Sequence, residues 1–118
     1  MSPHDKPLVW LKGGVKTPPL SDAARIEAGF LLRRLQGGEL LSLPASRPMP
    51  TNGSGGHELR GRDGEANWRV MHHIADDAVV VLDVFAKKTG VTPKTVLDAC
   101  RQRLAMYRKV TKGTRDAR

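Results

Sequence analysis

The sequence predicts an α+β domain in which the helices cover one face of a single antiparallel sheet. Two stretches of the 118 residues carry apolar side chains at helical spacing, which predicts two helices. Between them, residues 57–85 contain three strand-like runs joined by short turns, and one more short apolar run precedes the first helix. The predicted order is strand, helix, long loop, three strands and helix, and such a sheet with two helices makes a two-layer arrangement.

The first strand is predicted at Pro7–Lys12, a short apolar run that two glycines follow. The first helix is expected to begin at Ser21, because a serine hydroxyl can accept a hydrogen bond from an unpaired amide of the first turn. Its apolar residues share one face of a helix: Ala24, Ala28, Leu31, Leu32 and Leu35. Gly37 and Gly38 predict the end of this helix.

Residues 39–56 form the long loop of the predicted order. The segment Glu39–Leu43 fits either a short turn of helix or an extended link. Three prolines and three glycines between residues 44 and 56 exclude regular structure after it. Loops of this length in small domains are often functional.

The three strands that follow are predicted at His57–Arg62, Trp68–Ile74 and Ala78–Phe85. Asp63-Gly64 is a turn signal between the first two. The last of the three is almost entirely apolar, which is typical of a strand with both faces covered. Because the links are short, the strands are expected to form an antiparallel meander.

Thr92-Pro93 predicts the start of the last helix, since proline is favoured at the first helical position. Its apolar residues again share one face: Val96, Leu97, Cys100, Leu104 and Tyr107. We expect one domain over residues 1–110 and a flexible tail over residues 111–118.

The charge of the chain favours an anionic partner. Lysine and arginine number 20 against 12 acidic residues, which gives a net charge of +8. No apolar run is long enough for a membrane span, and the N-terminus lacks the apolar stretch of a secretory signal. The single cysteine excludes an intrachain disulfide and fits a reducing compartment. A cytoplasmic protein with no membrane association is therefore expected.

Metal and cofactor sites are not predicted. His72 and His73 are adjacent and would point to opposite sides of a strand, and the chain has no Cys-x-x-Cys or His-x-x-x-His pair. Cys100 falls among the apolar residues of the last helix, so it is expected in the core.

Basic residues of the meander form the candidate site. Glu58, Arg60 and Arg62 share one face of their strand, and Arg69, Met71 and His73 share a face of the next. If these strands are neighbours, a set of cations meets on the open side of the sheet with one or two histidines: Arg60, Arg62, Arg69 and Lys88. This set matches metal-free RNA cleavage, which needs a base, an acid and cations around the phosphate. It also matches a solvated basic face, and Trp68 fits either a base-stacking residue or a core anchor.

Short motifs in order across residues 6–107 resemble the HigB-like, phage-derived branch of the RelE/ParE toxin superfamily. They are Lys6-Pro7-Leu8-Val9-Trp10-Leu11-Lys12-Gly13, Lys16-Thr17-Pro18-Pro19, Gly29-Phe30-Leu31-Leu32-Arg33-Arg34-Leu35-Gln36, Ser46-Arg47-Pro48-Met49-Pro50, His57-Glu58-Leu59-Arg60, Trp68-Arg69-Val70, Val84-Phe85-Ala86-Lys87-Lys88-Thr89 and Thr92-Pro93-Lys94. The resemblance implies a RelE-like domain and the toxin of a type II toxin–antitoxin pair. Most such toxins are ribosome-dependent, metal-free endoribonucleases that cut mRNA.

The resemblance also implies site residues and partners. Arg60, Arg69 and Lys88 match basic positions of the active face, and His57 or His73 would transfer protons. Five further residues are expected to contact RNA or the ribosome: Arg62, Lys87, Trp68, Arg33 and Arg34. The implied partners are a helix-turn-helix antitoxin, the ribosome and mRNA.

Two positions depart from the family pattern, and two other functions stay open. A tyrosine usual in RelE members is absent near Pro93, and His72-His73 stands where this branch tends to carry Tyr-Arg. The alternatives are a non-enzymatic ParE-like gyrase poison and a degenerate toxin that only binds its antitoxin.

Overall fold

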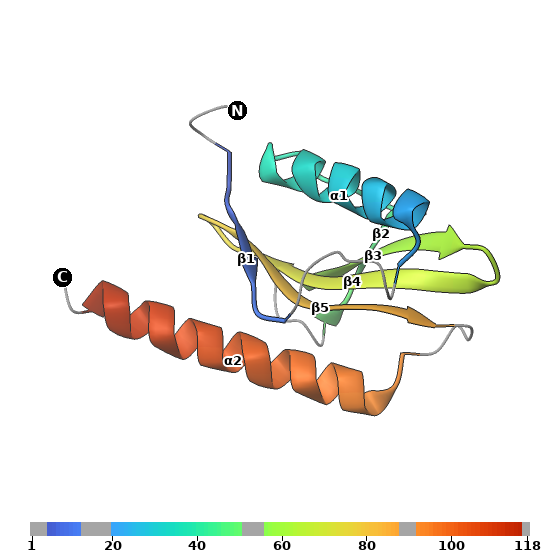
Figure 1. Cartoon of the computed structure of the whole chain (residues 1–118). Helices are drawn as coiled ribbons and strands as arrows, with labels where there is room; N and C mark the ends of the chain where they lie inside the picture. The colour runs from blue at the N-terminus through green and yellow to red at the C-terminus, as the bar shows by residue number, and fades with distance from the viewer. Residues whose placement is uncertain (1–4, 13–19, 51–55, 88–91, 117–118) are drawn as a thin grey trace.

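Five strands form one sheet in the order β1-β5-β4-β3-β2, with one helix on either side (Figure 1). The computed structural model describes residues 5–12, 20–50, 56–87 and 92–116. The elements in chain order are β1 (Leu8–Trp10), α1 (Asp22–Gln36), β2 (Ser46–Pro48), β3 (Gly56–Asp63), β4 (Ala66–Ile74), β5 (Val79–Lys87) and α2 (Lys94–Asp116). The α+β class that the sequence predicts is confirmed.

The strands β2 to β5 pair antiparallel, as the meander predicts, whereas β1 pairs parallel to β5. The sheet is therefore mixed, and the prediction of an entirely antiparallel sheet is wrong at this edge. Parallel neighbours need a long crossover, and here the whole segment between β1 and β5 supplies it. The turn between β3 and β4 contains Gly64 at φ +65°, a left-handed conformation that glycine adopts without strain.

The two helices cover opposite faces of the sheet, so the prediction of both helices on one face is wrong. Val79 and Val81 of β5 pack in a core with α1, and Val80 and Leu82 pack in a second core with α2. Because β5 is apolar on both faces, each face needs a helix to exclude water.

Both helices begin as the sequence predicts. The Ser21 hydroxyl accepts a hydrogen bond from the Ala24 amide at the start of α1. The helix α2 follows Pro93 and continues through Asp116, past Thr111, where a tail is expected. The strand β2 lies inside the segment predicted to be irregular.

A bulge in the pairing of β4 with β5 turns two consecutive residues of β5 toward the same side of the sheet. Met71 pairs with Asp83, but the next residue, His72, pairs with Val81. Leu82 is thus the extra residue, and both Leu82 and Asp83 contact groups on the α2 side. A bulge permits two consecutive residues to face one side.

Candidate functional site

A buried carboxylate lies among the polar side chains of the sheet. Glu58 of β3 pairs with Met71 of β4, whose side chain packs in the core on the α2 side. Cross-strand partners share a face, so Glu58 faces the α2 side, as does Arg60 two residues along the strand. Arg60 pairs with Arg69 of β4. The register therefore brings two arginines beside Glu58.

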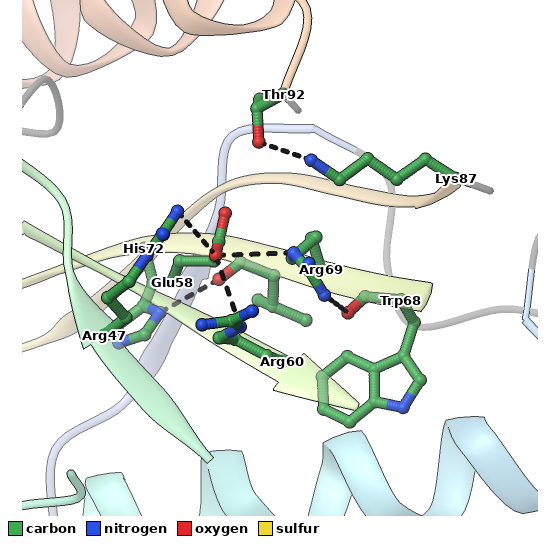
Figure 2. Close-up of polar contacts among 9 residues, drawn as sticks. Arg47, Glu58, Arg60, Trp68, Arg69, His72, Lys87 and Thr92 are labelled. Atoms are coloured by element: carbon green, nitrogen blue, oxygen red, sulfur yellow. Dashed lines mark hydrogen bonds and ion pairs between the residues drawn. The ribbon is translucent and has the colours of Figure 1, made fainter. Parts of the chain in front are cut away.

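Three guanidinium groups surround the Oε1 atom of Glu58 (Figure 2). This oxygen lies 3.3 Å from Nη2 of Arg47, 3.8 Å from Nε of Arg60 and 3.3 Å from Nε of Arg69. Arg47 comes from β2, where it pairs with Glu58 in register. We call Arg47, Glu58, Arg60 and Arg69 the arginine cluster.

Burial divides the arginine cluster into an inner and an outer part. Glu58 is 0% exposed and Arg69 is 4% exposed, whereas the side chains of Arg47 and Arg60 are 44% and 32% exposed. One carboxylate cannot neutralise three guanidinium groups, so the cluster keeps a positive charge that solvent can reach. Because a guanidinium plane offers two parallel hydrogen bonds to a phosphate, the cluster is suited to bind one.

Lys87 of β5 is a further cation that interacts electrostatically with the residues of the arginine cluster. Its pKa is lowered because the side chain is partly buried and because Arg69 repels it, while Glu58 opposes the shift. Its Nζ donates a hydrogen bond to Oγ1 of Thr92 at 2.7 Å (Figure 2). The pKa of Arg69 is also lowered, mainly by burial, with Glu58 again opposing. An ammonium group with a lowered pKa is a better proton donor than an ordinary lysine.

An open groove of about 580 Å³ lies where α1, the segment before β2 and the β3–β4 hairpin meet. Three of the residues that line it are arginines: Arg60, Arg62 and Arg69. Two of these, Arg60 and Arg69, also belong to the arginine cluster, whose guanidinium groups meet Glu58 on the α2 side of the sheet. We call this space the hairpin groove.

The two histidines predicted to transfer protons, His57 and His73, lie on opposite faces of the sheet. His57 pairs with His72, and their rings stack with centroids 5.9 Å apart on the face opposite Glu58. His72 is fully buried, which lowers its pKa to about 4, and its Nδ1 lies 3.1 Å from the Val70 carbonyl oxygen. His73 is buried on the same face as Glu58 and pairs with Gly56, two residues along β3, so it is a diagonal neighbour of Glu58 at about 7–8 Å.

The other predicted contact residues have varied positions. Lys88 lies outside the described residues. The prediction that Trp68 contacts RNA is wrong. Its side chain is fully buried in the α1-side core, so it cannot stack on a base. A side-chain carbon on Gly61 would lie 2.2 Å from the Trp68 Nε1 atom, so the indole occupies the space above that glycine. Arg33 and Arg34 lie in the last turn of α1.

Both α1 arginines have acidic partners of their own. Arg33 donates to Asp5 at 2.6 Å, and Arg34 pairs with Glu39. Neither lines the hairpin groove.

Two members of the arginine cluster were not predicted as site residues. Arg47 lies in a proline-rich segment with no recognisable period, so nothing in the sequence places it beside β3. For Glu58 the sequence predicts only that it shares a face with Arg60 and Arg62. The alternation along this strand indicates which side of the sheet Glu58 faces, but it does not indicate how deeply the side chain is buried.

Among residues 5–12, 20–50, 56–87 and 92–116, no group of three or more histidine, cysteine, aspartate or glutamate side chains could hold a metal ion. Over the same residues, neither helix is long and apolar enough to cross a membrane. Cys100 is buried in the α2-side core, and burial raises the pKa of its thiol to about 11.

A family model described as phage derived protein Gp49-like (DUF891) matches residues 19–105, about three quarters of the chain. The match includes every member of the arginine cluster and all residues that line the hairpin groove. No curated protein and no solved structure gives a match.

Proposed function

The chain belongs to the Gp49-like family of phage-derived proteins, a family commonly associated with RelE/HigB-type toxins, and we propose that it is a toxin that cleaves mRNA on the ribosome. The observation that carries this proposal is the arginine cluster. It gathers three guanidinium groups around one buried carboxylate and leaves two of them open to solvent. Such an arrangement fits a backbone phosphate better than it fits a structural ion pair.

In the proposed reaction, the 2′-hydroxyl of a ribose loses its proton to a solvent water, its oxygen attacks the adjacent phosphorus, and the bond to the 5′-oxygen breaks. The products are a 2′,3′-cyclic phosphate and a free 5′-hydroxyl. Arg60 and Arg47 bind the phosphate oxygens, and Arg69 adds positive charge from behind them. Fixed cations around the phosphate stabilise the charge that grows in the transition state.

Glu58 is a positioning residue in this proposal, because its carboxylate is buried and holds the three guanidinium groups in one place. Lys87 supplies a proton to the leaving 5′-oxygen, a role that its lowered pKa favours. His57 and His73, which the resemblance implies as proton-transfer groups, do not lie in the cluster, and Lys88 stays a prediction.

The proposal includes a helix-turn-helix antitoxin that neutralises the toxin, and it places the protein in the cytoplasm with its ribosomal target. The side chains of Ile26 and Phe30 on the outer face of α1 are exposed at 65% and 62%. They are four residues apart, so they form one apolar surface on the helix, which supports a protein partner there.

The test is induction of the chain in cells without its antitoxin, followed by mapping of transcript ends. We expect growth arrest and new 5′ ends within coding regions. Arg60→Ala is expected to remove both effects, while Arg101→Ala, a change to an exposed arginine of α2 that pairs with Asp98, keeps them. Growth arrest with intact transcripts and DNA damage would indicate a gyrase poison instead. Harmless expression with tight antitoxin binding would indicate a module without activity.

A further inference from the structure

The ammonium group of Lys87 contacts two different parts of the fold. Its Nζ donates a hydrogen bond to Oγ1 of Thr92 at 2.7 Å (Figure 2). It also lies 5.8 Å from the centre of the Phe85 ring, within the range of a cation–π contact. Phe85 and Lys87 share a face of β5, whereas Thr92 comes directly before Pro93 and α2. The ammonium therefore connects β5 with the segment that begins α2.

The arginine cluster lies on the same face of the sheet as Lys87. Phe85 pairs with Arg69 of β4, so Lys87, two residues along β5, is a diagonal neighbour of Arg69 at about 7–8 Å. Four charged side chains of β2, β3 and β4 act on the ammonium: Arg47, Glu58, Arg60 and Arg69. Three of the four repel it, and burial also disfavours its charge. Both effects push the ammonium toward water, so its contacts must keep it beside the cluster.

We infer that Thr92 is a positioning residue whose hydroxyl holds the Lys87 ammonium beside the arginine cluster, where it protonates the leaving 5′-oxygen. Thr92 acts through Lys87 and not on the RNA. The inference rests on the proposed function for the role of Lys87.

A threonine hydroxyl is suited to this task because it has little freedom and no charge. The branched side chain of Thr92 restricts its χ1 rotation, and Pro93 restricts the backbone of the residue before it to an extended form. A lysine ammonium, in contrast, is a compact charge on a flexible stem, so the acceptors of its N–H groups determine its position. A carboxylate in place of the hydroxyl would raise the pKa of Lys87 and make it a weaker proton donor.

The position of Thr92 depends in turn on α2. The amides of Val96 and Leu97 donate to the Pro93 carbonyl oxygen at 3.0 Å and 3.2 Å, so Pro93 is fixed by the first turn of the helix. The side chains of Val96 and Leu97 pack against the α2-side core. The packing of α2 on the sheet thus sets the place of the residue that holds Lys87.

The first test measures the protonation of Lys87 without any RNA. In the full chain with isotopically labelled lysine, the Nζ signals are followed against pH by NMR, and the signal missing in Lys87→Gln is assigned to Lys87. In Thr92→Val the pKa of Lys87 is expected to rise toward the value of an ordinary lysine. The released ammonium moves into water and away from Arg69, and water replaces the lost hydrogen bond.

Two variants serve as controls for the missing hydroxyl. Thr92→Val keeps the branched shape of threonine and puts a methyl group in place of the hydroxyl, whereas Thr92→Ser keeps the hydroxyl. Thr92→Ser is therefore expected to leave the pKa of Lys87 as in the wild type. Thr95→Val is expected to do the same, because Thr95 is an exposed threonine of the first turn of α2.

The second test measures cleavage with purified ribosomes and a defined mRNA. Thr92→Val is expected to cleave about tenfold more slowly than the wild type, and Thr92→Ser within about twofold of it. In a Lys87→Gln background, Thr92→Val is expected to have no further effect, because a residue that acts through Lys87 loses its role with it. A merely structural role would slow both backgrounds by the same factor.

The outcomes separate this inference from the proposed function. An unchanged or lower pKa of Lys87 in Thr92→Val would overturn the inference, as would cleavage by Thr92→Val at the wild-type rate or an equal further loss in the Lys87→Gln background. Absence of cleavage by the wild type would contradict the proposed function alone, because the NMR titration reports where the ammonium lies without any reaction.

Discussion

Glu58 and Asp83 are both buried carboxylates on the α2 side of the sheet, and each pairs across the strands with Met71. Asp83 contacts Lys12 at 3.7 Å and Arg103 of α2 at 3.5 Å, and it accepts a hydrogen bond from the Val84 amide at 2.8 Å. We call Asp83, Lys12 and Arg103 the aspartate cluster. The two clusters thus lie in one cross-strand row, about 10 Å apart at the usual strand spacing.

The origin of the cations distinguishes the two clusters. Arg103 also donates to the Leu82 carbonyl oxygen at 2.9 Å, so the aspartate cluster fastens α2 to β5. The arginines of the arginine cluster come from β2, β3 and β4, and they connect no helix to the sheet. A buried carboxylate with cations around it is therefore not a functional site in itself. The arginine cluster differs because it holds three cations around one carboxylate and leaves two of them open to solvent.

The largest expected effect is on stability, when each carboxylate is replaced by its amide. Glu58→Gln is expected to lower the free energy of unfolding by about 3–5 kcal/mol, because it leaves the buried Arg69 guanidinium without a counter-ion. Asp83→Asn is expected to cost about 1–3 kcal/mol, because the Arg103 side chain is 26% exposed and solvent replaces part of the lost pairing, whereas Arg69 is 4% exposed. Urea denaturation followed by circular dichroism measures both values, and the reverse order would contradict this account of the two clusters.

The next prediction is that a change in the arginine cluster lowers activity and a change in the aspartate cluster lowers stability. Arg60→Ala is expected to lower the rate of mRNA cleavage by about 10²–10³-fold, because one group that stabilises the transition state is lost. Its partly exposed side chain contributes little to stability. Arg103→Ala is expected to lower stability by about 1–3 kcal/mol and to leave the cleavage rate of the folded protein unchanged.

Purified ribosomes with a defined mRNA give the cleavage rates, and urea denaturation of the same samples gives the stabilities. If Arg103→Ala loses activity while it stays folded, the aspartate cluster is not purely structural and the distinction between the two clusters is wrong.

The pH dependence of cleavage tests Lys87. A proton donor acts in its protonated form, so the rate is expected to fall as the pH rises through the pKa of Lys87. Since burial and Arg69 lower this pKa, the fall is expected at a lower pH than for an ordinary lysine. Lys87→Gln is expected to reduce the rate about 10²-fold and to remove this part of the profile. A fall at the same pH in the wild type and in Lys87→Gln would assign it to another group.

The order of the elements could be predicted because each one carries its own local pattern. Ser21 and Pro93 mark the helix starts, and Asp63-Gly64 marks the turn of the hairpin. Which face each helix covers could not be predicted in the same way, although the apolar run Val79–Leu82 indicates two covered faces. The face that each helix covers depends on the path of the chain between strands, and the sequence of a single segment does not indicate that path.

The candidate site could be predicted only in part, for a related reason. Alternation on β3 and β4 places Arg60 and Arg69 on one face, and strand pairing then brings them together. The depth of Glu58 and the presence of Arg47 depend on β2, a strand of three residues in a proline-rich segment. Short edge strands are stabilised by pairing with their neighbour and not by their own propensity. The sequence pattern therefore does not predict the strand or the positions of its side chains.

The smallest expected effect compares the outer cation of each cluster. Arg47 and Lys12 are 44% and 55% exposed, and each pairs with a buried carboxylate. Replacement of either by alanine is expected to cost about 0–1 kcal/mol of stability, since solvent screens exposed pairs. Stability alone therefore does not separate the two residues.

Cleavage is expected to separate them. Arg47→Ala removes one of two solvent-accessible guanidinium groups of the arginine cluster, so the rate is expected to fall about tenfold or more, as for a lost phosphate contact. Lys12→Ala is expected to keep the wild-type rate, because Lys12 contacts Asp83 and not Glu58. Equal rates for both variants would mean that Arg47 only shields Glu58, and the phosphate site would then consist of Arg60 and Arg69. A lower rate for Arg47→Ala alone extends the site to the edge strand β2, the part of the sheet that the sequence pattern does not reveal.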